Sequence, residues 1–394
     1  MHSDHQLLNR LSRRTFLRST TSLAALTQFR WVAKATVLPK QSTVAYIACR
    51  QKIEGRDDAL QVFSLHNGRW AAIQRVPTRA PSCVVLSRDQ QTLYVANHVD
   101  TYKGLPRGTV EAFRIDPSDG HLEPLSKQAL SLSATYPRHM ALSPDGRLLA
   151  VAADGGTIYN LLPVSEGGNL DRPCSIFKQL DCAPHTRFPA KANFGRLLFD
   201  TTGDHLLSSG FGNNRLSIFA LAQNPMGRRM QQRAVEIDDL GACALHPDGS
   251  MLYVWRKRES SLSCYRYNSA AGEIGESMQR VSMPTYGNDA ASLKSLAIHP
   301  SGRMLYATQS AHGRLQAWHI SVQNGLLSQS THIEFDSAPD GEMIVASNRD
   351  SLFVLDPLRG LIRRVEVDSV TGELGSMEEG VTIDGAQSMA FKTL

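Results

Sequence analysis

The segment HMALSPDGRLLAVAA, residues 139–153, contains the pattern from which the rest of this chain is built. A short apolar stretch leads into a Pro-Asp-Gly turn, and a second apolar stretch follows it. Proline presets φ, while Asp and Gly tolerate the left-handed conformation of a tight turn, so the segment predicts a β-hairpin. The hairpins of this pattern are Ser82–Asn97, Arg138–Ala153, Gly195–Gly210, Ala242–Arg256, Ser295–Thr308 and Ile333–Asn348.

A third alternating segment follows each hairpin. These third segments are Thr109–Ile115, Thr157–Val164, Arg215–Leu221, Leu262–Tyr267, Leu315–Ile320 and Leu352–Asp356. A turn such as Asp-Gly-His-Leu or Asn-Gly-Leu-Leu then leads into a fourth strand. Four strands in each repeat, at a period of about 40 to 57 residues, are typical of a β-propeller blade.

Segments from both ends of the chain together supply the strands of one blade. Val44–Ala48, Leu60–Leu65 and Ala71–Val76 provide three strands of a blade without its first strand, and Ala386–Phe391 matches the missing one. We therefore predict an all-β, seven-bladed β-propeller with four antiparallel strands per blade, closed by the C-terminal strand beside the N-terminal blade. Because closure completes the core and removes exposed sheet edges, we expect a monomer.

The charge distribution argues against nucleic acid as a partner. The 394 residues include 42 Lys and Arg against 37 Asp and Glu, a net charge of +5. Six of the basic residues and one acidic residue lie within residues 1–35, so the remainder is formally neutral. A basic surface for nucleic acid is not expected. No stretch reaches the roughly 18 apolar residues of a membrane-spanning helix.

The N-terminus has the pattern of an export signal. Ser12-Arg13-Arg14-Thr15-Phe16-Leu17-Arg18 resembles a twin-arginine translocation motif, with an apolar stretch and a small-x-small cleavage site, Ala33-Lys34-Ala35, after it. An amphipathic helix interrupted by Arg30 is the alternative. We expect residues 1–35 to be a signal peptide, 36–394 to be one propeller domain, and the protein to be periplasmic or extracellular. Cys174 and Cys182 could then form a disulfide or remain two thiols.

Whole-chain features resemble a known family. Tyr136-Pro137-Arg138-His139 before the hairpin, and the Gly-x-Leu turns between third and fourth strands, resemble the lactonase family of seven-bladed propellers. That family includes bacterial 6-phosphogluconolactonase and fungal carboxymuconate cyclase, and the similarity spans about residues 43–394. The resemblance implies a lactone (carboxylic ester) hydrolase that needs no cofactor.

This sequence lacks the polar residues that the resemblance implies for the family's site. The resemblance implies a His, an Arg, a Glu and a second Arg at the positions that align with Gly195, Gly241, Lys257 and Ser310. All four residues differ from the family pattern. A non-catalytic binding or scaffold propeller that has lost the chemistry is therefore the alternative to an enzyme, because propellers host both roles.

Propeller geometry places candidate site residues independently of the family. The loops between blades and those joining second to third strands open on one face, around the central channel. The candidates there are Arg50, Asn97, His98, Arg138, His139, Arg256, Lys257, His312 and Arg349, with Asp154 and Asp289 as acidic ones. Several cations around one opening favour an anionic ligand, although solvated loop charges are the alternative.

Lactone hydrolysis requires a base to activate water and a cation or donor at the carbonyl oxygen. We predict His139 as base and Arg138 as clamp, unless His139 is a structural residue. His185, in the long insertion 181–193, is a third catalytic candidate if that insertion is not merely a capping loop. The predicted substrate-binding residues are Arg50, Asn97, Arg256, Lys257 and Arg349.

The remaining motifs predict little further chemistry. The loop 98–108, with Lys103 and Arg107, is a candidate substrate lid. His246 and His299 directly precede hairpin residues and are expected to be structural, on the opposite face. No metal-ligand cluster, Gly-x-Ser-x-Gly elbow or phosphate-binding loop is present. We expect hydrolysis of an anionic sugar-acid or related small lactone in the cell envelope, without a metal.

Overall fold

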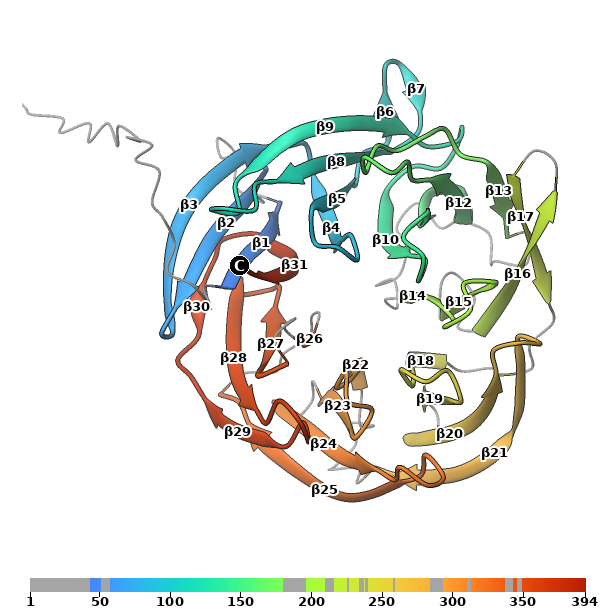
Figure 1. The fold of residues 1–394 in the computed structure, drawn as a ribbon, viewed down its shortest axis with the longest axis vertical. Coiled ribbons are helices and arrows are strands. Elements are labelled where there is room, and N and C mark those ends of the chain that lie inside the picture. Colours follow the sequence, from blue (N-terminus) through green and yellow to red (C-terminus); the bar gives the residue numbers. More distant parts are fainter. Residues whose placement is uncertain are drawn as a thin grey trace, which may run out of the picture. The chain divides into compact units, whose positions relative to one another are not determined.

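The computed structural model describes residues 43–50, 57–179, 196–209, 216–224, 227–233, 237, 240–257, 259–283, 293–309, 313–336, 343–345 and 349–394. These residues form seven antiparallel blades around a central axis (Figure 1), as predicted. Each blade has four strands in a row, and the first of them is innermost.

The strands are given from the centre outward. Blade 1 contains β31 (Ala386–Thr393), β1 (Thr43–Cys49), β2 (Ala59–His66) and β3 (Arg69–Pro77). Blade 2 contains β4 (Pro81–Leu86), β5 (Thr92–Asn97), β8 (Thr109–Ile115) and β9 (Leu122–Ala129), with a small hairpin of β6 (Thr101–Tyr102) and β7 (Leu105–Pro106). Blade 3 contains β10 (Pro137–Leu142), β11 (Leu148–Ala153), β12 (Ile158–Pro163) and β13 (Ser175–Lys178), and a 3-10 turn, η1 (Gly155–Thr157).

Blade 4 contains β14 (Arg196–Phe199), β15 (His205–Ser209), β16 (Leu216–Asn224) and β17 (Gly227–Arg233). Blade 5 contains β18 (Leu240–Leu245), β19 (Met251–Arg256), β20 (Ser261–Asn268) and β21 (Glu273–Ser282). Blade 6 contains β22 (Leu293–Ile298), β23 (Met304–Gln309), β24 (Arg314–Ile320) and β25 (Leu327–Glu334). Blade 7 contains β26 (Met343–Val345), β27 (Ser351–Asp356), β28 (Leu361–Val367) and β29 (Leu374–Met377), and β30 (Val381–Thr382) also pairs with β28.

The C-terminal strand closes the ring, which confirms the prediction for Ala386–Phe391. β31 pairs with β1 from Thr43 opposite Thr393 to Cys49 opposite Ala386. The Phe391 ring stacks on Phe353 of blade 7 with 3.7 Å between the ring centroids, and Trp70 packs edge-on against both. The last strand is therefore held by a ladder to blade 1 and by aromatic packing to blade 7.

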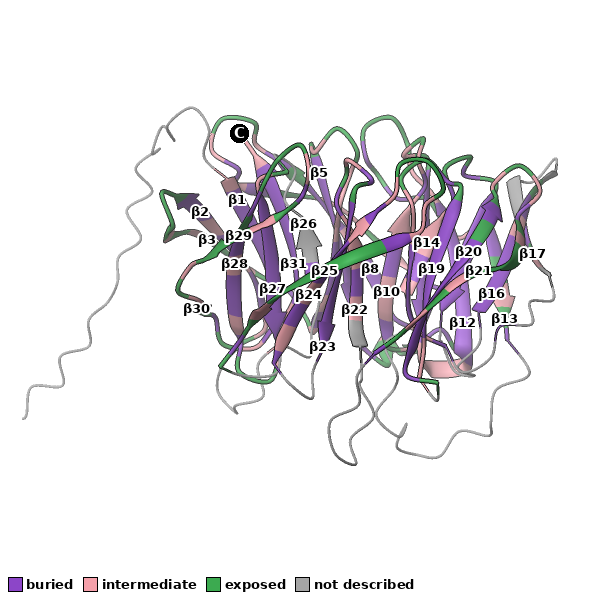
Figure 2. Ribbon diagram, turned by 90° about the horizontal axis from the view of Figure 1, so that it is seen from below, coloured by how far each residue is buried: buried purple, intermediate pink, exposed green. Residues whose placement is uncertain are grey.

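The core lies between the blades rather than at the axis. Seven clusters of buried apolar side chains each join two neighbouring blades. Second strands such as β5 and β11 are buried along their whole length, because a blade packs on each of their faces. Figure 2 shows these buried strands beside exposed turns and outer strands.

A repeated hydrogen bond ties neighbouring blades together. A tyrosine in the second strand donates its hydroxyl to a glycine carbonyl in the turn between the third and fourth strands of the next blade. The pairs are Tyr46–Gly120 (3.0 Å), Tyr94–Gly168 (3.2 Å), Tyr253–Gly325 (2.7 Å) and Tyr306–Gly372. Burial raises the pKa of each of these hydroxyls, to about 12 for Tyr94, so they remain donors at neutral pH.

Blade 7 differs from its prediction. The hairpin predicted at Ile333–Asn348 would turn at Pro339-Asp340-Gly341, but β25 ends at Glu334 and the inner strand β26 begins at Met343. Leu352–Asp356, predicted as a third strand, belongs to the second strand, β27, which is buried throughout and pairs with both β26 and β28. The strands of blade 7 are therefore shifted along the chain relative to the prediction, and Pro339-Asp340-Gly341 lie outside the described residues.

Candidate active site at the channel mouth

Bulges mark the starts of four inner strands. Register shifts occur at Pro81/Cys83, Pro137/His139, Leu240/Cys243 and Leu293/Ser295. A bulge re-aims the extra side chain, and bulges are common beside binding sites. In blade 3 the bulged residue is Arg138, and His139 resumes the ladder opposite Ala152.

Arg138 forms an ion pair with Asp154. Nε of Arg138 lies 2.7 Å from Oδ2 of Asp154, and the two side chains are 24% and 18% exposed. The Asp154 amide donates to the Tyr136 carbonyl at 3.1 Å, and the Gly155 amide donates to the Thr135 carbonyl at 2.9 Å. The loop that carries Asp154 is thus fastened to the segment that carries Arg138, so both side chains are held in place.

Two more cationic or basic side chains join this pair. Burial lowers the pKa of Arg50, the nearby charge of Arg138 lowers it further, and Asp58 opposes both. Burial and the charges of Arg50 and Arg138 lower the pKa of His98 to about 4, so its imidazole is neutral at pH 7. Blades 1, 2 and 3 therefore contribute Arg50, His98 and Arg138 to one site, where Asp58 and Asp154 accompany the two guanidinium groups.

His139 lies at the same site but has little basicity. Burial, followed by the charges of Arg138 and Arg196, lowers its pKa to about 3. Its Nε2 atom is buried and makes no hydrogen bond in the described structure. The predicted base is therefore a neutral imidazole from pH 5 upward, and it is a weak acceptor for a proton from water.

Arg196 is a site residue that the sequence analysis missed. It starts β14 opposite Ser209, as His139 lies opposite Ala152 in blade 3. Its Nη1 atom donates to the Leu296 carbonyl on β22 at 2.6 Å, so the side chain reaches from blade 4 to blade 6. The available signal was a basic residue at the start of an inner strand, directly after Gly195.

The long loop of blade 2 is fastened to the segment that precedes β10, and its β6–β7 hairpin lies at the outer rim of the ring (Figure 1). Among its residues, Val99 accepts from the Tyr136 amide at 2.9 Å, and Pro106 accepts from the Ser133 amide at 2.7 Å. Tyr136 has a φ of +56°, is 38% exposed, and packs its ring 5.0 Å from His98. These bonds fasten the predicted lid to the segment before β10, and the half-exposed Tyr136 ring packs beside the His98 imidazole.

Comparison with known proteins finds similarity along nearly the whole chain. The family model described as "Lactonase, 7-bladed beta-propeller" matches residues 44–391. The chain belongs to this family. It is 21% identical over 311 residues to a 6-phosphogluconolactonase of Bacillus subtilis, covering 77% of this chain and 84% of that one.

Solved structures related to this lactonase-family chain share its fold. A periplasmic gluconolactonase from Pseudomonas aeruginosa has a TM-score of 0.73 at 19% identity, over 89% of this chain and 99% of that chain. A putative 6-phosphogluconolactonase from Bacteroides fragilis has a TM-score of 0.72 at 17% identity, over 91% and 100%. At these identities the likeness concerns the propeller itself.

One departure from the family pattern has a steric reason. At Gly241, where the resemblance implies an arginine, a Cβ atom would lie 2.4 Å from Cδ1 of the fully buried Trp255. The indole fills the space that a longer side chain would need. Lys257 lies in the turn after β19, while Gly195 and Ser310 lie outside the described residues.

Two predicted ligand-binding residues, Asn97 and Arg256, have partners within the protein. Asn97 is fully buried and donates to Thr78 Oγ1 and the Arg79 carbonyl, while it accepts from Thr109 Oγ1. Nη2 of Arg256 lies 2.9 Å from Glu259 Oε1, and Glu259 also pairs with Arg280 at 3.0 Å. Arg256 and Lys257 both belong to blade 5, which lies beside blade 4 in the ring (Figure 1).

Arg349 is not on the predicted face. Because β26 and β27 are the first two strands of blade 7, the loop that joins them opens on the face opposite the candidate site. The Arg349 carbonyl accepts from Nε2 of His299 at 3.0 Å, which confirms a structural role for that histidine. His185, His312 and Asp289 lie outside the described residues.

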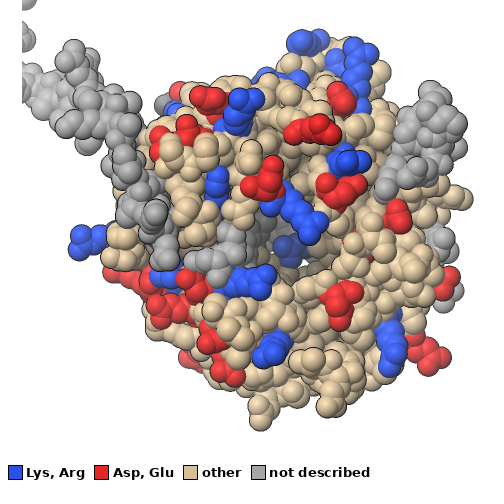
Figure 3. Space-filling model, viewed as in Figure 1, with Lys and Arg blue, Asp and Glu red and all other residues tan. Residues whose placement is uncertain are grey.

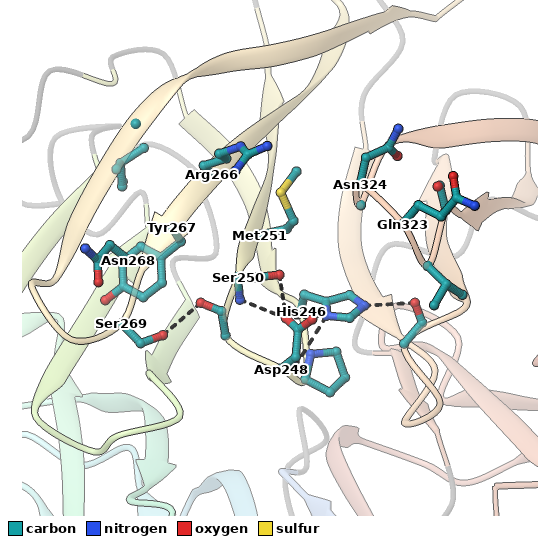
Figure 4. Close-up of a pocket in the computed structure, with 18 of the residues that line it drawn as sticks. His246, Asp248, Ser250, Met251, Arg266, Tyr267, Asn268, Ser269, Gln323 and Asn324 are labelled. Atoms are coloured by element: carbon teal, nitrogen blue, oxygen red, sulfur yellow. Dashed lines mark hydrogen bonds and ion pairs between the residues drawn. The ribbon is translucent and has the colours of Figure 1, made fainter.

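The face opposite the candidate site, which Figure 3 shows, has basic and acidic side chains interspersed. It also carries a polar groove of about 1110 Å³ between blades 5 and 6. Figure 4 shows His246, Asp248 and Ser250 on one side of this groove and Gln323 and Asn324 on the other. Nε2 of His246 bonds the Gly302 carbonyl at 2.9 Å, so this histidine is structural, as predicted.

The described part of the chain has neither a metal-ligand cluster nor a membrane-spanning helix. No three His, Cys, Asp or Glu side chains there come together in a way that could hold a metal ion. No helix in those residues is long and apolar enough to cross a membrane.

Proposed function

We propose that the protein hydrolyses an anionic lactone, a sugar-acid lactone or a related small one, at the channel mouth of blades 1 to 4. The observation that carries the proposal is the convergence of Arg50 and Arg138 with Asp154 on one face of a lactonase-family propeller. Guanidinium groups are suited to phosphate and carboxylate, because their planar donors can bind two oxygens at once.

The site offers what ester hydrolysis requires. The tetrahedral intermediate carries negative charge on the former carbonyl oxygen, and fixed donors in a partly buried site stabilise that charge. Arg138 is held by Asp154, and Arg196 is held across the channel by the Leu296 carbonyl. Both guanidiniums are therefore oriented before a substrate arrives, which limits the reorganisation needed during the reaction.

The second part of the proposal is export through the twin-arginine pathway to the cell envelope. The motif at Arg13 and Arg14 supports it, and one structural relative is described as a periplasmic gluconolactonase. In a bacterial host, R13K/R14K should leave the protein in the cytoplasmic fraction while the parent chain is exported. Equal export of the parent and the variant would contradict this part.

A binding or scaffold propeller is the second candidate function. It is favoured by Gly241, where Trp255 excludes the side chain that the family pattern implies. This function predicts that an anionic ligand binds at the arginine cluster without being changed.

The two functions are separated by titrating acid release. Ring opening of a lactone releases one proton at neutral pH, so a pH-stat measures turnover directly. The panel contains phosphorylated, carboxylated and neutral lactones, and the control is the buffer rate for each. We expect saturable turnover with the highest kcat/KM for an anionic lactone. Rates equal to buffer throughout would refute the enzyme and leave the binding function.

A further inference from the structure

Among the described carboxylates of the channel mouth, Asp154 is the one paired with an arginine of the proposed site, and backbone hydrogen bonds hold its loop in place. It follows β11, precedes η1, and is fastened through its own amide and through Gly155 to the segment at Thr135 and Tyr136. Two nearby carboxylates have hydrogen-bond partners outside the arginine pair. Asp58 accepts from the Ala80 amide at 2.8 Å, and Asp100 accepts from the Tyr136 hydroxyl at 3.4 Å.

We propose that Asp154 is the general base of the lactonase and that Arg138, besides binding the anionic substrate, holds the Asp154 carboxylate in place. This inference rests on the proposed function. It replaces His139 as the base and assigns a role to a carboxylate that the family pattern does not mark.

The geometry leaves one carboxylate oxygen for water. Oδ2 of Asp154 is taken by Arg138 at 2.7 Å. Within the described residues no group bonds Oδ1, and the side chain is 18% exposed, so a water molecule can reach it. A base has to lie within about 2.6–3.2 Å of the proton donor that it serves, and a water on Oδ1 meets that condition.

The direction of the pKa shift also favours Asp154 over His139 as the general base. Burial raises the pKa of Asp154 above that of an exposed aspartate, and Arg138 counteracts part of this rise. The pKa of His139 moves in the opposite direction, to about 3. Arg138 is the charged group that acts on Asp154. The titratable groups around Arg138 are Arg50, His98 and His139, with Asp58 near Arg50 and Arg196 near His139. Asp100 accepts from the Tyr136 hydroxyl. The Asp154 carboxylate is thus more basic than an exposed aspartate, whereas the His139 imidazole is less basic than an exposed histidine.

The reaction balances with water as the only co-reactant. Asp154 accepts one proton from water as the water oxygen bonds to the lactone carbonyl carbon. The tetrahedral intermediate collapses, the ring C–O bond breaks, and the leaving oxygen takes the proton back from Asp154. The product hydroxy acid then ionises and releases the proton that the pH-stat titrates. No oxidant, reductant or metal takes part in this sequence.

The test compares three variants with the parent protein on the lactone it hydrolyses fastest. D154N keeps the size of the side chain but removes the base, and we expect kcat to fall by about 10²- to 10⁴-fold. H139Q should reduce kcat by less than about 10-fold. E259Q is the matched control, because Glu259 also pairs with an arginine in a loop joining second and third strands. It should leave kcat unchanged, and unfolding midpoints check that all variants fold.

The pH profile tests the positioning role separately. Asp154 must be ionised, so kcat/KM falls on the acid side as Asp154 is protonated. Because Arg138 lowers the pKa of Asp154, R138Q should move that acid limb to higher pH. A merely structural role would lower the rate without moving the limb.

The outcomes are distinguishable. A parent protein that turns over no lactone refutes the proposed function, and the inference falls with it. An active parent with D154N within about threefold of it, or with H139Q losing more than D154N, refutes Asp154 as the base. An acid limb that stays in place in R138Q refutes the positioning role of Arg138.

Discussion

Replacing Gly155 by alanine should displace the loop that carries Asp154. A Cβ atom at Gly155 would lie 1.7 Å from Oγ1 of Thr135, 2.9 Å from its Cβ and 3.1 Å from its carbonyl oxygen. Gly155 itself does not have a positive φ, so the cost comes from lack of space rather than from backbone strain. Overpacking of this kind costs about 1–3 kcal/mol, or roughly 2–6 °C in Tm.

The effect on turnover should exceed the effect on stability. Asp154 and Gly155 are bonded to consecutive carbonyls, those of Tyr136 and Thr135, so a shift at Gly155 moves the carboxylate relative to Arg138. A displacement near 1 Å at a reacting group costs about 10²-fold in rate. We expect kcat/KM of G155A to fall by that factor in the pH-stat, while thermal unfolding remains cooperative.

A second substitution tests the stated cause. Truncating Thr135 to alanine removes the shortest contact, that with Oγ1, but keeps the contacts with the Thr135 Cβ and carbonyl oxygen. G155A/T135A should therefore recover part of the lost Tm and activity. G155A/T135S keeps the hydroxyl and should not recover. A G155A protein with parental Tm and kcat/KM, or a double variant G155A/T135A no better than G155A alone, would refute the reasoning.

Three further predictions concern single contacts. Y306F removes the hydroxyl that bonds the Gly372 carbonyl in the next blade, and should lower the free energy of unfolding by about 1 kcal/mol in urea titrations; no change would show that the inter-blade bond contributes nothing. His139 has its pKa lowered from 6.5 to about 3, so below pH 6.5 the unfolded chain binds a proton that the folded one excludes, and stability falls as the pH falls. Between pH 7 and pH 5 the parent should lose at most about 2 kcal/mol more than H139Q, and parallel stability curves would contradict the burial of a neutral imidazole. R50Q should raise KM for an anionic lactone about 10-fold or more and leave KM for a neutral one within about twofold; equal losses for both would remove Arg50 from anion binding.

Most of the fold could be predicted because each hairpin carries its own turn signal. Pro144-Asp145-Gly146 and its counterparts mark the join of the first two strands, and Ala386–Phe391 is apolar where the N-terminal blade lacks a strand. Blade 7 could not be placed in this way. Its Pro339-Asp340-Gly341 has the turn signal of the first two strands, but Ser351–Asp356 is the second strand of the blade, and its continuous burial was not used to place it.

The sequence could predict which residues lie on the face of the site, but not which side chains interact there. Loop topology brought Arg50, Arg138 and Asp154 to one face, and the structure places them together. Side-chain partners are not visible in sequence, so Asn97 was predicted as ligand-binding although it is fully buried and bonded to Thr78. The weak basicity of His139 also depends on burial and on arginines from two blades, which neither local motif nor spacing reveals.

The central claim is that an anionic lactone is opened at the mouth formed by blades 1 to 4. The most direct test is a crystal structure of the D154N protein soaked with the lactone that the parent hydrolyses fastest. We predict the anionic group on Arg50 and Arg138. The lactone carbonyl carbon should lie about 3–3.5 Å from a water bound to the amide that replaces the Asp154 carboxylate. A ligand bound instead in the groove between blades 5 and 6, or a water held by another residue, would contradict the claim.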